Sequence, residues 1–176
     1  MKIITLDDFL QQQDFYITEA KANKIFVYPT DTIYGIWAIY TPENVEKIFA
    51  IKQRDTKKIF SIIAPDFKRI LNNYKWSITN DKLQEYLNSY HWVTYIFNYN
   101  RPGVRIIKHH FQKFVEKLGT PFITTSCNIS WEPIITEVKN IPQDIADKVE
   151  YIIDGGTLWG KPSVLIDFVS NKIIER

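Results

Sequence analysis

The sequence contains a single cysteine, Cys127, and it has neither a long apolar run nor a large excess of charge of one sign. One cysteine cannot form an intrachain disulfide, and it excludes a metal site built on cysteine spacing. No apolar run approaches the roughly 18 residues of a membrane span. The N-terminus turns acidic at Asp7 and Asp8 before the apolar core of a signal peptide can develop. We therefore expect a reduced, cytoplasmic protein that does not enter a membrane.

The charges of the chain nearly cancel. There are 22 Lys and Arg residues against 20 Asp and Glu residues, which leaves a formal net charge of +2. Bulk charge therefore does not indicate nucleic-acid binding, although a local basic patch stays open. Hydrophobic residues make up 45% of the 176 residues, which is enough for a sizeable core. The length favours one domain over residues 1–176.

Helical and strand patterns alternate along the chain without a repeat or a linker. We expect helices over 6–22, from Thr41-Pro42 to Lys52, and over 66–74, 80–90 and 109–118. We expect strands over 24–28, 59–64, 92–97, 104–107, 121–125, 149–153, 163–168 and 172–174. Some of these strands are joined by helices and others resemble hairpins. The predicted fold is α/β, with a twisted sheet of parallel and antiparallel strands and flanking helices.

Two segments carry polar side chains at every second position directly after an apolar strand. The first contains Thr30, Thr32 and Tyr34, and the second contains Thr124, Ser126 and Asn128. Binding sites of α/β proteins form at the ends of strands. Thr, Ser and Asp also favour ordinary turns, because they bond their own backbone. Each segment alone fits a turn, and the presence of two favours a site.

A basic cluster follows the helix that begins at Thr41-Pro42, and it consists of Lys52, Arg54, Lys57 and Lys58. Cations in a last helical turn often only complement the helix dipole. Lys52, however, continues an apolar stripe of that helix, formed by Val45, Ile48 and Phe49. Its ammonium group should emerge at the edge of the core, where a phosphate or carboxylate could replace lost hydration.

Arg105 lies within an apolar strand pattern. It either points to solvent at an open face or offers a planar fork to a carboxylate or phosphate. The neighbouring His109 and His110 have no carboxylate or cysteine at metal-ligand spacing, so we expect surface histidines and no protein metal site.

Residues 155–161 fit the first seven positions of a P-loop, but Pro162 stands where that motif needs Ser or Thr. A strand pattern follows instead of a helix, so we reject this motif and retain a glycine-rich turn that ends at Ser163. No histidine is tied to a Ser or Cys nucleophile by a local motif. The candidate residues therefore suit a reaction in which ATP and a small substrate supply the reacting groups.

Five motifs in this order resemble the YrdC-like family of threonylcarbamoyl-adenylate synthases. They are PTDTIYG at 29–35, KQR at 52–54 with Lys58, Val104-Arg105, TTSCNIS at 124–130, and the glycine-rich segment 155–163. The resemblance implies an α/β sheet with a concave, positively charged cavity. It also implies that L-threonine, bicarbonate and ATP, with Mg²⁺, give threonylcarbamoyl-AMP and pyrophosphate. The product would serve a downstream transferase complex that modifies tRNA.

The resemblance also implies roles for single residues. The positions that match the family's threonine site are Thr30, Tyr34, Lys58 and Arg105. The positions that match its ATP site are Lys52, Arg54, Thr94, Thr124, Ser126, Asn128 and Ser163. Lys52 and Arg54 would be the catalytic cations, because they offset charge that gathers on the phosphates.

The chain departs from the family pattern at several positions. Two family prolines are Asp55 and Ile59 here, and a usual glycine is Trp131, where backbone freedom is expected. The chain resembles the short, single-domain form of the family. A non-catalytic RNA-binding module of the same fold is the alternative, because a basic concave face with nearby aromatic side chains could accept RNA.

Overall fold

The computed structural model describes residues 1–53, 60–66, 85, 92–99, 102–107 and 109–175. The two helices expected over 66–74 and 80–90 lie almost entirely outside these residues. The same holds for Arg54, Asp55, Lys57, Lys58 and Ile59.

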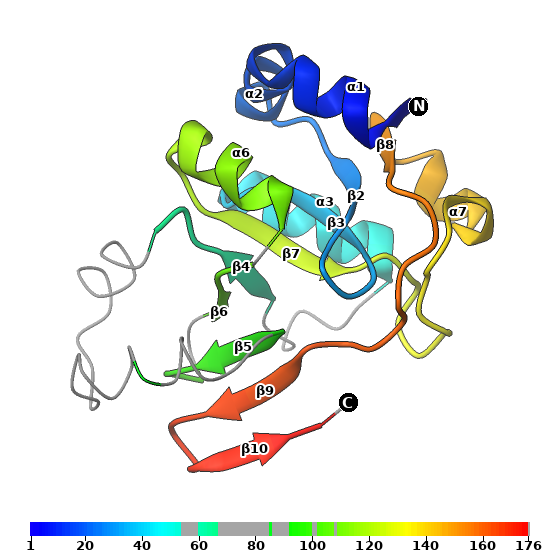
Figure 1. Cartoon of the computed structure of the whole chain (residues 1–176). Helices are drawn as coiled ribbons and strands as arrows, with labels where there is room; N and C mark the ends of the chain where they lie inside the picture. The colour runs from blue at the N-terminus through cyan, green and yellow to red at the C-terminus, as the bar shows by residue number, and fades with distance from the viewer. Residues whose placement is uncertain (54–59, 67–84, 86–91, 100–101, 108, 176) are drawn as a thin grey trace.

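The described residues form one mixed sheet, in which the strands follow the order β1-β8-β2-β3-β7-β4-β6-β5-β9-β10. Figure 1 shows how this sheet runs through the molecule. The strands are β1 (Lys2–Thr5), β2 (Phe26–Pro29), β3 (Tyr34–Ile39), β4 (Ser61–Ile63), β5 (Val93–Ile96), β6 (Gly103–Arg105), β7 (Phe122–Ser126), β8 (Tyr151–Asp154), β9 (Val164–Asp167) and β10 (Lys172–Ile174). Four neighbouring pairs are parallel, namely β1/β8, β2/β8, β4/β6 and β5/β9, and the others are antiparallel. The predicted mixed sheet is confirmed.

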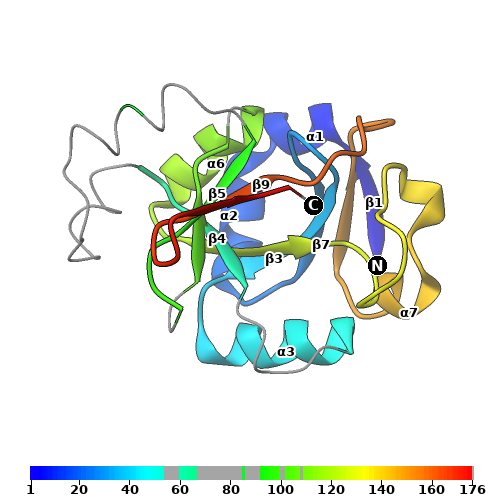
Figure 2. The same cartoon turned by 90° about the horizontal axis from the view of Figure 1, so that it is seen from below.

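Helices cover both faces of the sheet, as Figure 2 shows. One face carries α1 (Leu6–Gln11), α2 (Gln13–Lys21) and α6 (His110–Leu118), and the other carries α3 (Pro42–Lys52) and the short α7 (Gln143–Ala146). Thr41 accepts a hydrogen bond from Asn44 N at the start of α3, and Pro42 occupies the first turn. Both features are typical of helix N-termini.

The alternation of side chains along β2 and β3 divides the core into two layers. Phe26 and Trp37 are paired across the two strands and stack with ring centroids 4.1 Å apart, on the side of α1, α2 and α6. The next pair, Val27 and Ile36, packs toward α3 and α7. Because both faces are covered, these strands are apolar at successive positions rather than at every second one.

Two strands and two helical details were not predicted. β1 is short, and its exposed residues acquire strand geometry by pairing with β8. β3 begins at Tyr34, within the polar segment 29–35, and the turn-forming residues of that segment did not indicate the start of a strand. The expected helix over 6–22 is divided at Gln12 into α1 and α2, and α7 is too short for a clear periodic pattern.

In the part of the chain that the structure describes, no helix is both long enough and apolar enough to cross a membrane.

Candidate functional site

A cavity of about 210 Å³ lies where the ends of several strands meet. Seven of the residues predicted for a site line it: Thr30, Tyr34, Thr94, Arg105, Thr124, Ser126 and Ser163. They come from segments that are far apart in the sequence. The sheet order places β3 beside β7 and β5 beside β9, and these pairings bring the polar segments to one place.

The segment after β2 is a buried turn rather than a polar edge of a strand. Thr30 N donates to Ile33 O, and the Thr30 hydroxyl accepts from the backbone N–H groups of Thr32 and Ile33. The Thr30 and Thr32 hydroxyls lie 2.9 Å apart, and both residues are buried. The turn interpretation is therefore right about the backbone, but the turn is not solvated and its threonines line the cavity.

Tyr34 is fully buried, and its hydroxyl group holds the glycine-rich segment in place. The hydroxyl donates to Gly156 O at 2.8 Å and accepts from Gly155 N at 3.0 Å. Burial raises the pKa of Tyr34 to about 12, so the hydroxyl keeps its proton near neutral pH and remains a donor. Tyr34 thus lines the cavity, but its hydroxyl belongs to the cavity's frame.

Replacing Tyr34 by Phe removes both of these hydrogen bonds. We expect a loss of about 1–3 kcal/mol in the free energy of unfolding, because Gly155 N and Gly156 O lose a partner. Urea unfolding measures this loss. Tyr40→Phe is the matched control, since Tyr40 is exposed. Equal stabilities of the two variants would contradict the anchoring role.

The second polar segment surrounds the ammonium group of Lys52. This side chain is only 2% exposed, and its Nζ donates to Ser126 O at 2.5 Å and to Asn128 O at 2.6 Å. The Ser126 hydroxyl donates to Asn128 Oδ1 at 2.6 Å. The prediction that Lys52 reaches the edge of the core is confirmed. Protein oxygens occupy the place that was expected for an external anion.

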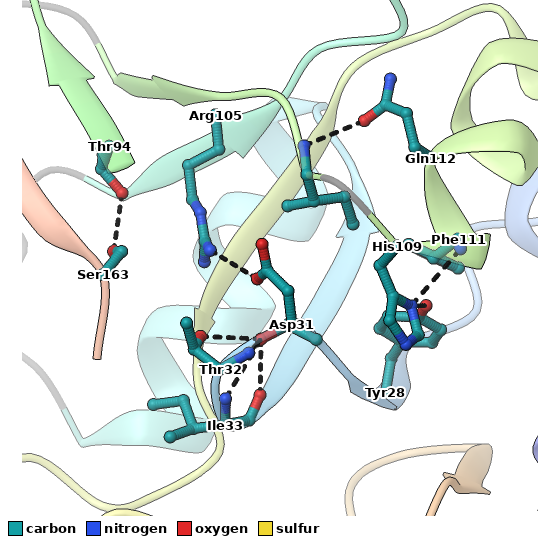
Figure 3. A network of polar contacts seen from close by, with 12 residues as sticks. Tyr28, Asp31, Thr32, Ile33, Thr94, Arg105, His109, Phe111, Gln112 and Ser163 are labelled. Atoms are coloured by element: carbon teal, nitrogen blue, oxygen red, sulfur yellow. Dashed lines mark hydrogen bonds and ion pairs between the residues drawn. The ribbon is translucent and has the colours of Figure 1, made fainter. Parts of the chain in front are cut away.

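Arg105 is buried and paired with Asp31, as Figure 3 shows. The Nη2 atom of Arg105 lies 2.7 Å from Asp31 Oδ1, and both side chains are less than 9% exposed. The interpretation of Arg105 as a solvent-facing residue is wrong, because the turn at 30–33 carries Asp31 over the end of β6. The Nε–H group of Arg105 is also buried and has no hydrogen-bond partner among the described residues. Arg105 therefore retains a buried donor that a ligand could satisfy.

His109 lies beside this pair and is not the surface residue that was expected. Its Nδ1 is 2.5 Å from the Tyr28 hydroxyl and also accepts from Phe111 N at the start of α6 (Figure 3). Burial lowers the pKa of His109 and raises that of Tyr28. The ring is accordingly neutral near pH 7, with Nδ1 accepting from the tyrosine. His110 is exposed, as predicted.

Thr94 and Ser163 close the cavity on the side of β5 and β9. Their hydroxyl oxygens lie 2.9 Å apart (Figure 3). Gly103 on β6 allows this approach, because a Cβ atom there would lie 2.8 Å from the Thr94 methyl group. After Ser163 the chain continues as β9, so the rejection of a P-loop is confirmed.

Some expectations lie outside the described residues. Arg54 and Lys58 belong to this group, and the positive charge expected for the cavity stays a prediction. Within the described residues no three His, Cys, Asp or Glu side chains gather to hold a metal ion.

Trp131 occupies a position where the backbone is left-handed. Its φ is 77°, and its side chain is 90% exposed. The expectation of backbone freedom here is confirmed, although the residue is a tryptophan. The turn is held by Glu132 N donating to Ile129 O and by Asn128 Nδ2 donating to Glu132 O. The strain of Trp131 is thus tolerated next to the Lys52 site.

Replacing Trp131 by Gly should give a more stable protein than replacing it by Ala. Both changes remove the ring, and only glycine adopts this conformation without strain, so we expect a difference of about 1 kcal/mol in the free energy of unfolding. Thermal unfolding of the two variants measures it. An alanine variant as stable as the glycine variant would show that the backbone at 131 is unstrained.

Sequence reasoning missed Asp31, Ser61 and Ile134. Asp31 pairs with Arg105, and the other two line the cavity. Asp31 stands inside the PTDTIYG motif, so its position pointed to the site, but its partner follows only from the sheet. Ser61 and Ile134 carry no distinctive sequence signal.

Comparison with known proteins agrees with this geometry. Residues 19–176 match the model of the Sua5/YciO/YrdC family, which is described as "Telomere recombination". A protein of Methanocaldococcus jannaschii is 31% identical over 92% of this chain and 83% of its own, and bears the provisional name of threonylcarbamoyl-AMP synthase. A threonylcarbamoyl-AMP synthase of Pseudoalteromonas translucida is 24% identical over 90% of this chain and 94% of its own.

Two solved structures share the fold. Sua5 of P. abyssi, in complex with L-threonine, has a TM-score of 0.78 at 23% identity and covers 99% of this chain. The chain spans only 56% of that protein. YciO of E. coli has a TM-score of 0.76 at 21% identity, covering 94% of this chain and 88% of its own. On the match of its residues 19–176 to the family model, the chain belongs to the Sua5/YciO/YrdC family.

Proposed function

We propose that the protein is a threonylcarbamoyl-AMP synthase, a nucleotidyltransferase that joins L-threonine, bicarbonate and ATP. The observation that carries this proposal is the buried Arg105 in the wall of a cavity rich in hydroxyl groups. Its Nε–H has no partner among the described residues. An arginine fork suits a carboxylate such as that of an amino acid.

The amino acid would lie against Arg105, with Thr30 and Tyr34 in the same wall. Lys58 completes the threonine side of this proposal. Asp31 already occupies one nitrogen of Arg105, at 2.7 Å. It orients the guanidinium group and leaves the remaining donors for the substrate.

The nucleotide would lie along the second polar segment and the start of β9. Five of the residues proposed for the ATP side are Thr94, Thr124, Ser126, Asn128 and Ser163. Lys52 and Arg54 would supply positive charge behind them. Because Lys52 bonds the carbonyl groups of Ser126 and Asn128, it also fixes the geometry of this segment.

The chemistry needs alignment and charge stabilisation more than a protein nucleophile. The threonine amine and bicarbonate give a carbamate and water. A carbamate oxygen then attacks the α-phosphorus of ATP, and pyrophosphate leaves with the bonding electrons. Mg²⁺ enters with ATP as part of the substrate and offsets phosphate charge.

The names of the relatives support the enzyme over the non-catalytic RNA-binding module. We propose that the reaction takes place in the cytoplasm and that its product passes to a tRNA threonylcarbamoyl transferase complex.

Pyrophosphate release tests the proposal. With saturating ATP and Mg²⁺, we expect release that requires both L-threonine and bicarbonate. Pyrophosphate release that does not depend on both L-threonine and bicarbonate would contradict the function. The absence of any release from folded protein would contradict it too. Titration with tRNA at several salt concentrations tests the alternative, because phosphate contacts weaken steeply with salt.

A further inference from the structure

A second cavity, of about 150 Å³, adjoins the polar one. The two share Thr32 and Pro162 in their walls. The second cavity differs in character, because two tryptophans, Trp92 and Trp159, form much of its lining together with Val164. Each cavity alone is smaller than the about 300–1,000 Å³ typical of small-molecule sites. Together they resemble one site with a polar half and an aromatic half.

The two tryptophans are unusually exposed for their size. Trp159 is 72% exposed and Trp92 is 45% exposed. Their rings meet edge to face, with centroids 5.4 Å apart and planes at 78°. This arrangement gives the cavity two aromatic walls at nearly a right angle. Large apolar surface left open to water is a common sign of a binding surface.

Backbone hydrogen bonds tie the segments that carry the two tryptophans to the rest of the fold. Val164 N donates to Trp92 O at 3.0 Å, which ties Trp92 to the start of β9. Gly160 N donates to Thr32 O at 3.2 Å, which ties the segment that carries Trp159 to the turn beside Arg105. Trp92 also has a φ of 57°, a costly conformation for a bulky residue. The backbone that carries the two aromatic walls is therefore tied to β9 and to the turn beside Arg105.

The charged residues that line the two cavities indicate that each cavity suits a different part of a ligand. Arg105 is the charged residue among the residues that line the polar cavity, so phosphate or carboxylate groups are favoured there. The aromatic cavity has one carboxylate, Asp31, and one ammonium group, Lys161. Asp31 is already paired with Arg105, and Lys161 lies 6.0 Å from the Trp159 ring centroid, so the walls of this half are mainly apolar. Its flat apolar walls fit an uncharged aromatic ring.

We propose that Trp92, Trp159 and Lys161 form a subsite for the base of a nucleotide whose phosphates lie in the polar cavity. This inference rests on the proposed function, which supplies ATP as the nucleotide. The base stacks on a tryptophan face. The Lys161 ammonium group lies 6.0 Å from the Trp159 ring centroid and supports that ring through a cation–π contact.

Calorimetric titration of Trp159→Leu with ATP and with inorganic triphosphate tests the subsite. Stacking on an aromatic side chain contributes about 1–3 kcal/mol per base, so we expect ATP to bind at least about five-fold more weakly. Inorganic triphosphate has no base, and its affinity should change less than about two-fold by the same argument. Trp131→Leu is the control, because Trp131 is also a highly exposed tryptophan and lines neither cavity. We expect it to bind both ligands like the unmodified protein.

Three results would overturn the subsite. ATP could bind Trp159→Leu and the unmodified protein equally well. The variant could bind ATP and triphosphate with equally reduced affinity, which would show that the aromatic cavity binds phosphate. The variant could bind a short single-stranded RNA more weakly while its affinity for ATP is unchanged, which would show that the tryptophans bind RNA. Pyrophosphate release in the same samples separates the two claims, since base-dependent ATP binding without turnover would contradict the function and leave the subsite intact.

Discussion

Replacing Arg105 by Ala should reduce threonine-dependent pyrophosphate release at least about 100-fold. A charge-assisted contact with a carboxylate contributes about 1.5–3 kcal/mol, and the binding geometry of the fork is lost as well. The change also leaves the buried carboxylate of Asp31 without its ion-pair partner, which lies 2.7 Å away in the unmodified protein. Removing one partner of a buried ion pair costs about 3–5 kcal/mol of stability. Steady-state kinetics over a range of threonine concentrations, together with urea unfolding, measures both effects.

A double variant separates catalysis from folding. In Arg105→Ala/Asp31→Asn the unpaired carboxylate at position 31 is removed. We therefore expect stability to recover in large part while activity stays low. Arg105→Lys keeps a positive charge and loses the planar fork, so it should raise the KM for threonine more than it lowers kcat. Full activity of the double variant would remove Arg105 from the substrate site.

Replacing Lys52 by Met should lower both turnover and stability. The methionine keeps an apolar stem of similar length, but the carbonyl groups of Ser126 and Asn128 lose their donor. Each unsatisfied buried group costs about 1–3 kcal/mol. For a protein of this size a loss of 1 kcal/mol lowers Tm by roughly 2–4 °C, so we expect a fall of about 5–10 °C. Turnover should drop at least about ten-fold, because a contact to a charged group contributes about 1.5–3 kcal/mol.

Lys47→Met is the matched control for Lys52. Lys47 lies on the same helix, but its side chain is 43% exposed and pairs with Glu43 one turn away. Exposed pairs of this kind contribute less than about 0.5 kcal/mol. A Lys52 variant that behaved like the Lys47 variant in rate and Tm would refute both roles of Lys52.

The parts of the fold that sequence could predict are those with strong local patterns. The α3 helix combines a Thr41 cap, a proline in its first turn and an apolar stripe that ends in Lys52, and the structure has all three. The mixed sheet followed from the way the strands are connected. Strand β1 could not be predicted, because its exposed residues depend on pairing with β8.

The site shows the same division. Local alternation predicted that Thr124 and Ser126 share a face, and both line the cavity. Tyr34 also lines the cavity, although residues 30–33 turn before β3 begins and its hydroxyl group donates to Gly156 O. The pairing of Arg105 with Asp31 spans 74 residues. It depends on how the turn lies over β6, which no local pattern encodes.

The most direct measurement of the central claim is the mass of the product formed from ATP, L-threonine and ¹³C-labelled bicarbonate. The proposed reaction predicts threonylcarbamoyl-AMP that carries one labelled carbon, with one pyrophosphate released for each molecule formed. A product without the label, or the absence of an adenylate while the protein is folded and all substrates are in excess, would contradict the account.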